Sequence, residues 1–141
     1  MLSSGASRDA QSQSVITEPL YLDTPYAIPD NSSLLVDGTD GNTGAIVITA
    51  PATTAVRAAG SIIQNISNRG GTISNSLPNT SGSGTGGIFI GNVTITSGVT
   101  NSGLITGLGF GVLLDSNIKL SGGINNQFYG TIQGGILGIG I

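Results

Sequence analysis

The stretch VTNSGLITG, at residues 99–107, decides the fold because the chain contains two further stretches of similar sequence, which makes it one of three repeats. ISNRGGTISN at residues 66–75 precedes it, and INNQFYGTIQGG at residues 124–135 follows it. Each copy places an isoleucine or valine two residues before an asparagine, and a second isoleucine shortly after a glycine. The second isoleucines, which are 32 and 27 residues apart, are Ile73, Ile105 and Ile132.

This spacing is that of one coil of a β-solenoid, in which about 20–30 residues supply about three short strands and their turns. Each coil lays its strands parallel on the previous coil, about 4.8 Å away. GIFIGNVTI at residues 87–95 matches GVLLDSNIKL at residues 111–120 at a similar offset. We therefore expect an all-β chain, a parallel β-helix of about four coils. A β-sandwich is the rival fold, and it does not predict the repeated phrase.

Alternation along each strand predicts which side chains fill the interior. Val93 and Ile95 face one side of their strand, and Thr94 and Thr96 face the other. Asparagines follow the inward isoleucine or valine by two residues, so they could bend the chain through the left-handed region and stack their amides as a ladder. The alternative is an ordinary turn asparagine in each coil. The predicted ladder positions are Asn68, Asn101 and Asn126, with the row Ile73, Ile105 and Ile132 beside them.

Three segments differ in composition. Residues 1–14 are small and polar and predict a mobile N-terminal tail. Residues 15–43 include three of the five prolines and predict an extended capping segment. Residues 44–141 alternate β-branched runs with turn clusters and predict the solenoid repeats. Within them, SLPNTSGSGTG at residues 76–86 is expected to loop out sideways as an insertion.

Composition excludes several classes of function. Charged residues make up 8% of the chain and the net charge is -3, so there is no basic surface for a nucleic acid. The chain has no Cys and no His, so it offers no thiol nucleophile, no imidazole base and no Cys/His zinc site. No apolar run is long enough for a membrane span. We expect no cofactor, no metal and no membrane insertion.

The acids also argue against an enzyme. Within the predicted repeats the carboxylate is Asp115, and Lys119 lies about 13 Å further along a strand. Glycoside hydrolysis needs two carboxylates at a fixed separation.

Two other short stretches could carry a function. DGTDGN at residues 37–42 is rich in oxygen-bearing side chains, as calcium loops are, but it matches no known calcium spacing, and a tight turn accounts for the same residues. Phe128 and Tyr129 are neighbours, so on a strand one would point inward and one outward.

The phrases GVTNSGLITG, GGINNQFYGTIQGG and NISNRGGTISNS resemble the repeats of bacterial autotransporter passengers. The likeness covers about residues 44–141 and lies in the pattern of isoleucine, asparagine and glycine. It implies a right-handed parallel β-helix displayed outside a Gram-negative cell. The translocator and signal peptide of that family are not found here, so we expect either a piece of a longer passenger or a short protein built from the same coils.

The C-terminal stretch GGILGIGI is apolar, uncharged and free of proline, which makes it a template for another strand. Its predicted assembly residues are Ile136, Leu137, Ile139 and Ile141. We expect the protein to be an extracellular or cell-surface structural solenoid, not an enzyme, that supports attachment, aggregation or biofilm. Its first expected partner is itself, end to end or strand to strand, as in a fibre. A host or bacterial surface glycan or protein is the alternative partner.

Overall fold

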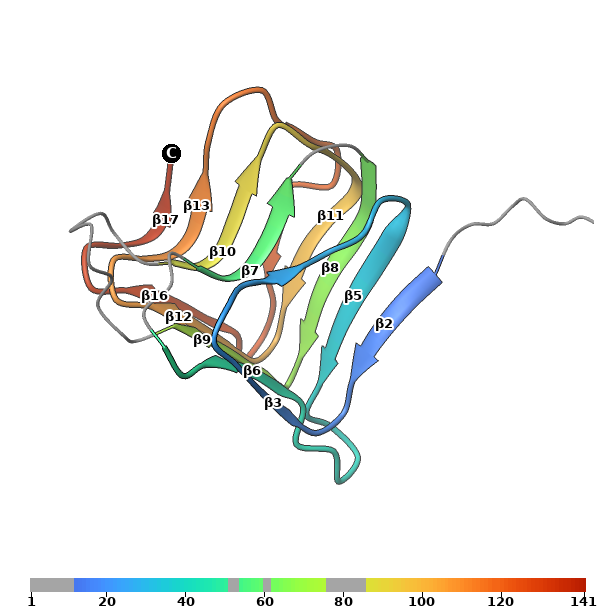
Figure 1. Cartoon of the computed structure of the whole chain (residues 1–141), viewed down its shortest axis with the longest axis vertical. Coiled ribbons are helices and arrows are strands. Elements are labelled where there is room, and N and C mark those ends of the chain that lie inside the picture. The colour runs from blue at the N-terminus through green and yellow to red at the C-terminus, as the bar shows by residue number, and fades with distance from the viewer. Residues whose placement is uncertain (1–11, 51–53, 60–61, 76–85) are drawn as a thin grey trace, which may run out of the picture.

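The computed structural model describes residues 12–50, 54–59, 62–75 and 86–141. These residues form strands and turns in three parallel sheets that wind round one interior (Figure 1). The fold is therefore a parallel β-solenoid, as the repeated phrase predicts. No helix in this part of the chain could span a membrane. The predicted tail and insertion lie outside the described residues, apart from the last three residues of the tail and the last of the insertion.

Each sheet contains equivalent strands from successive coils. The first sheet contains β2 (Ser12–Ile16), β5 (Ser32–Asp37), β8 (Ile62–Arg69), β11 (Thr94–Asn101), β14 (Lys119–Leu120) and β15 (Ile124–Asn126). The second contains β3 (Pro19–Leu22), β6 (Ala45–Ile48), β9 (Thr72–Asn75), β12 (Leu104–Gly107) and β16 (Thr131–Gly134). The third contains β4 (Tyr26–Ala27), β7 (Thr54–Ala59), β10 (Gly86–Gly91), β13 (Phe110–Leu114) and β17 (Leu137–Gly140).

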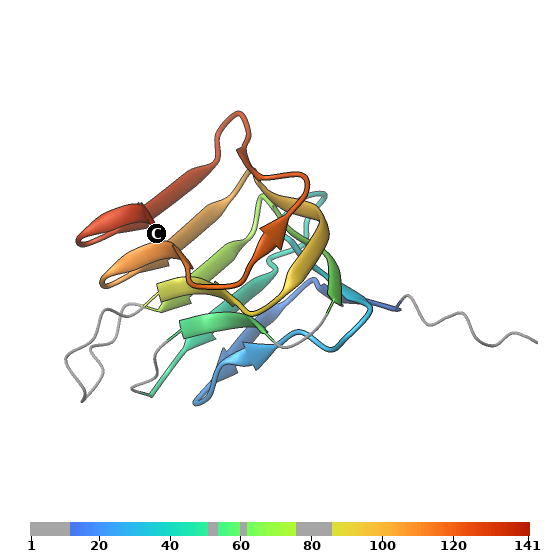
Figure 2. The same cartoon turned by 90° about the horizontal axis from the view of Figure 1, so that it is seen from above.

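The strand register aligns the three copies of the repeated phrase. Ile105 on β12 pairs with Ile73 on β9 and with Ile132 on β16. Val99 on β11 pairs in the same way with its equivalents on β8 and β15. The offset between residues 87–95 and 111–120 is also the observed register. Figure 2 shows the coils stacked along one axis.

The stack has five coils, where the sequence predicts about four, because residues 15–43 contribute strands of their own. β2, β3 and β4 form the first coil, and β5 opens the second. All four strands pair in parallel with strands of the next coil. The expected capping segment is thus part of the continuous β-structure, and the prolines that suggested a cap lie at strand starts and in turns.

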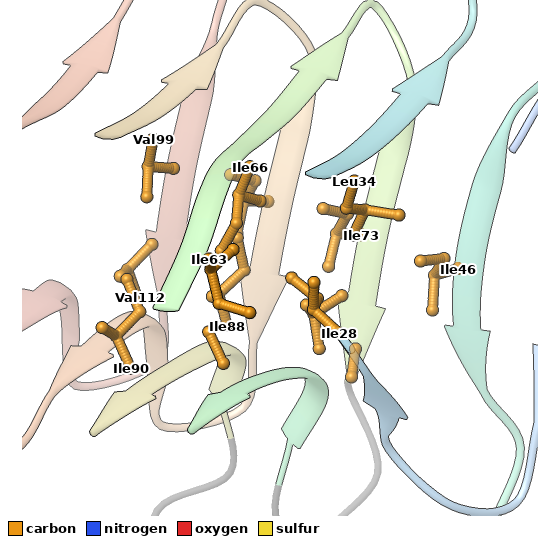
Figure 3. Close-up of a cluster of buried hydrophobic side chains, with 14 of the residues drawn as sticks. Ile28, Leu34, Ile46, Ile63, Ile66, Ile73, Ile88, Ile90, Val99 and Val112 are labelled. Carbon is orange, nitrogen blue, oxygen red and sulfur yellow. The ribbon is translucent and has the colours of Figure 1, made fainter. Parts of the chain in front are cut away.

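Rows of aliphatic side chains fill the interior (Figure 3). The row of Ile46, Ile73 and Ile105 is fully buried, with 0% exposure at each residue. Val93 and Ile95 are buried while Thr96 is exposed, as alternation predicts. Burying one such aliphatic side chain contributes about 1.5–3 kcal/mol, so these rows are the main source of stability. The interior positions are repeated from coil to coil, which is why coil spacing is readable in the sequence.

Candidate functional site: the asparagine corner and the terminal edges

Three asparagines, of which Asn68 and Asn101 are buried and Asn126 is exposed, form a hydrogen-bonded ladder across the last three coils. The side-chain Nδ2 of Asn68 donates to Asn101 Oδ1 at 2.8 Å, and Asn101 Nδ2 donates to Asn126 Oδ1 at 2.8 Å. The middle amide also accepts from the Gly103 N–H at 3.2 Å. At the last coil, Asn126 Nδ2 donates to the Gly130 carbonyl at 2.9 Å. The ladder therefore ties successive coils together at one corner.

The prediction that these asparagines bend the chain through the left-handed region is wrong. None of the three has a positive φ. The asparagines that do are Asn31, Asn92 and Asn117, with φ of 57°, 49° and 56°, and they lie at the corner between the third and first sheets. The ladder amides stack from extended strands: Asn101 and Asn126 end β11 and β15, and Asn68 is the last residue but one of β8.

A column of glycines stands at the same corner, and the sequence reasoning missed it. One glycine directly precedes each second-sheet strand from the second coil onward: Gly44, Gly71, Gly103 and Gly130. A Cβ on Gly103 would overlap the carbonyl oxygen of Gly71, and one on Gly130 would overlap that of Asn101. Backbones of neighbouring coils touch there, so only glycine fits. The detectable signal is a glycine immediately before each short β-branched run.

The turn that follows β5 is held by an ion pair to the next coil. Arg69 Nη2 contacts Asp37 Oδ2 at 2.6 Å, and Arg69 Nε contacts Oδ1 at 3.3 Å. The Thr39 N–H and hydroxyl donate to Oδ1 at 3.0 and 2.7 Å, and Asn42 Nδ2 donates to Oδ2 at 3.2 Å. Because the carboxylate accepts these bonds in its charged form, the Arg69 guanidinium, followed by the Thr39 hydroxyl and N–H, holds the pKa of Asp37 well below its usual range, against the opposing effect of burial.

The predicted calcium loop, residues 37–42, is this same turn. Both oxygens of Asp37 accept hydrogen bonds from protein donors, and Asp40 is exposed with a φ of 55°. Among the described residues, no three acidic, histidine or cysteine side chains group together as metal ligands. The geometry is that of a tight turn in which Asp37 binds the backbone two residues on.

The four predicted assembly residues lie in or beside β17, at the C-terminal end of the stack. β16 and β17 each form the outer edge of their sheet. The exposed fractions are 68% for Ile136, 52% for Leu137, 42% for Ile139 and 101% for Ile141. Residues 120–141 include no charged side chain. The structure thus brings these residues together on an uncharged, apolar edge.

The interior rows lose their cover at this end. Ile132 is only partly buried, whereas its register partner Ile105 has 0% exposure. Ile124 is also partly buried, and its partner Val99 is 1% exposed. In both rows the last member is less buried than the member before it, because no coil of this structure covers it.

Phe128 and Tyr129 both point outward, contrary to the prediction that one faces inward. They lie in a turn between β15 and β16, where Tyr129 has a φ of 67°. Their exposed fractions are 82% and 88%, and their rings pack edge to face with centroids 4.8 Å apart. Strand alternation does not apply in a turn, so two neighbouring aromatic rings are free to lie on the same surface.

The N-terminal edge differs in chemistry from the C-terminal edge. Its coil, with the turns that adjoin it, contains three prolines and three exposed acids: Pro19, Pro25, Pro29, Glu18, Asp23 and Asp30. The described residues 12–50 include no lysine or arginine. Prolines cannot donate to a neighbouring strand, so this edge is a poor template for further pairing.

The acid and base of the predicted repeats are not brought together. Asp115 and Lys119 are both exposed. The one ion pair in the described part of the chain joins Arg69 and Asp37. The arrangement therefore offers a hydrogen-bonded corner and two unlike edges as its distinctive features.

Comparisons with protein families, with characterised proteins and with solved structures found no match to this chain. The solenoid fold is accordingly established from the strand register and the buried rows alone.

Proposed function

We propose that this chain is a structural, adhesive β-solenoid of the autotransporter-passenger type, working outside the cell in attachment, aggregation or biofilm. The observation that carries the proposal is the continuous register of five coils around aliphatic rows. Such a stack is a rod that grows by about 4.8 Å per coil and presents its corners to the surroundings.

Corner turns vary in length without disturbing the register, which suits a display function. Two residues separate Asn101 from the start of β12, whereas four separate Asn126 from the start of β16. The strands on either side nevertheless stay in register. In the longer turn, Phe128 and Tyr129 are exposed. We infer that the corners supply contacts to surfaces while the strands supply stiffness.

The test is display of the full chain on a Gram-negative cell, fused to a signal peptide and a translocator. The matched control carries Ile105→Asp, which places a charge in a fully buried row and unfolds the solenoid. We expect cells that display the wild-type chain to settle faster and to be retained better on a surface. Equal settling and retention, with the wild-type chain resistant to protease at the surface, would contradict the proposal. Retention that an added glycan competes away in a saturable manner would favour the glycan-binding alternative.

A further inference from the structure

The loop that joins β5 to β6 projects from a corner of the stack (Figure 1). It begins with both Asp–Gly pairs of the chain, Asp37–Gly38 and Asp40–Gly41. An aspartate that precedes glycine can react with its own backbone, because glycine has no side chain to shield the attacking nitrogen. We propose that Asp40–Gly41, and not Asp37–Gly38, isomerises spontaneously in the folded protein, which makes Asp40 a site of covalent modification.

The reaction needs no reagent but water. The Gly41 nitrogen attacks Cγ of the Asp40 carboxyl group in its protonated form, and a C–N bond closes a succinimide ring. The hydroxyl group of that carboxyl and the amide proton leave as water. A water molecule then opens the ring. Attack at Cγ restores aspartate, whereas attack at the former backbone carbonyl leaves the chain running through Cβ and Cγ. This second product is isoaspartate, which has a free α-carboxyl group and one more methylene in the backbone.

The backbone between Asp40 and Gly41 is free to react. Their φ values are 55° and 84°, and the Asn42 N–H donates to the Thr39 carbonyl at 2.9 Å, which is the pattern of a type I′ turn. Neither the Asp40 carbonyl nor the Gly41 N–H is hydrogen-bonded to a residue that the structure describes. Asp40 is exposed, and no atom beyond the adjoining residues lies within 4 Å of the Cβ position of Gly41. This peptide can therefore rotate until its nitrogen reaches Cγ.

The same dipeptide at Asp37–Gly38 is held still. The Gly38 N–H, whose nitrogen would have to attack, donates to the Arg69 carbonyl at 2.9 Å. The Asp37 carbonyl accepts from the Gly44 N–H at 2.8 Å, so the backbone is fixed on both sides of the bond. The Arg69 guanidinium also binds the Asp37 carboxylate and lowers its pKa, which keeps this group in the charged form that does not react.

The extra methylene would stay within the loop. The bond from the Gly44 N–H to the Asp37 carbonyl closes the loop behind the modified residue, so β5 and β6 keep their places. The contacts that span the modified bond are those of Asn42, whose N–H donates to Thr39 and whose Nδ2 donates to Asp37 at 3.2 Å. We expect the product to remain folded with a looser turn. Its free α-carboxyl group would be a substrate for a carboxyl methyltransferase that uses S-adenosylmethionine.

The experiment is prolonged incubation of the full chain at neutral pH, with circular dichroism to verify folding. Electron-transfer fragmentation of its peptides locates the isoaspartate, and enzymatic methylation measures its amount. We expect isoaspartate to form at Asp40 at least about tenfold faster than at Asp37, because Asp37 must first break its hydrogen bonds. In urea, which removes these bonds, the two positions should react at similar rates.

The matched variant is Asp40→Glu, which keeps the charge but would have to close a larger ring that forms more slowly. We expect it to abolish the methylation acquired by the folded protein. Equal rates at Asp37 and Asp40 in the folded protein, or methylation that persists in Asp40→Glu, would overturn the inference. So would a folded wild type that gains no isoaspartate at Asp40 while the chain in urea does. None of these measurements involves cell attachment, so the inference and the proposed function can fail separately.

Discussion

At the scale of single residues, a few polar side chains are buried among the aliphatic rows of the described residues, and Asn101 and Asp37 are two of them. Asn101 is fully buried and bonds to the amides on both sides of it. Asp37 is 5% exposed and accepts bonds from Arg69, Thr39 and Asn42. Buried polar groups are costly unless they are paired, so each of these sites fixes one arrangement of the neighbouring coils.

The middle of the ladder should matter more than its end. Asn101→Ala removes two hydrogen bonds: the one that Asn68 Nδ2 donates to Asn101 Oδ1, and the one that Asn101 Nδ2 donates to the Thr131 carbonyl. We expect a loss of about 3 kcal/mol in the free energy of unfolding, measured by denaturant titration. Asn126→Ala, at the exposed end, should cost about 1 kcal/mol. Equal losses at the two positions would argue that the amides act independently and form no ladder.

The Asp37–Arg69 pair should make stability depend on acid. The pKa of Asp37 is lowered in the folded state, chiefly by Arg69, so below about pH 3.9 the unfolded chain binds a proton that the folded chain does not. The free energy of unfolding therefore falls as the pH drops below that value, and the contribution is complete above it. Asp37→Asn should flatten this part of the curve, measured by thermal melts over an acid pH series. If the wild type and Asp37→Asn lose stability equally as the pH falls, Asp37 is not the cause of the acid dependence.

At the scale of the strand and its corner, close backbone contact limits which residues fit. The glycine column stands where the backbone of one coil touches the next, and the strand that follows donates across that contact. The Leu104 N–H, for example, donates to the Gly71 carbonyl at 2.9 Å. In the last three coils the corner therefore combines an asparagine at or next to the end of one strand with a glycine that directly precedes the next strand.

The corner glycine should not tolerate a methyl group. Gly103→Ala forces a Cβ against the backbone of Gly71, and we expect it to lower the free energy of unfolding by about 2–3 kcal/mol. The control is Gly41→Ala, in a turn where nothing lies within 4 Å of the added Cβ but φ is 84°. That substitution should cost about 1 kcal/mol, from backbone strain alone. A smaller loss at Gly103 than at Gly41 would refute the close contact between coils.

At the scale of the whole molecule, the two ends of the stack differ. The first coil contains prolines and exposed acids, which make its edge a poor template for another strand. The last coil exposes apolar rows and a strand edge that pairs on one side only. Exposed strand edges of this kind pair with other chains unless they are covered.

Much of this organisation is readable in the sequence, because a solenoid repeats its interior. The equivalence of Ile73, Ile105 and Ile132 predicts the register, and the amide ladder follows from the matching asparagines. The sequence does not predict the first coil, because residues 15–43 lack the phrase and contain prolines. The register shift between Ile95 and Gly98 could not be read either, since it depends on how β11 packs against β8. The partner of Asp37 lies in the next coil, 32 residues away, where no local pattern points to it.

The register of the coils is the central claim, and a disulfide tests it most directly because the chain has no cysteine of its own. Ser67 and Thr100 are register partners whose hydroxyl oxygens are 3.1 Å apart. We predict that Ser67→Cys with Thr100→Cys forms an intramolecular disulfide under mild oxidation. The control is Ser33→Cys with Ser67→Cys. Leu35 is the register partner of Ser67, so Ser33 lies two residues away from that partner, and this pair should not form a disulfide. Failure of the first pair to cross-link, or equal cross-linking in both, would contradict the solenoid register.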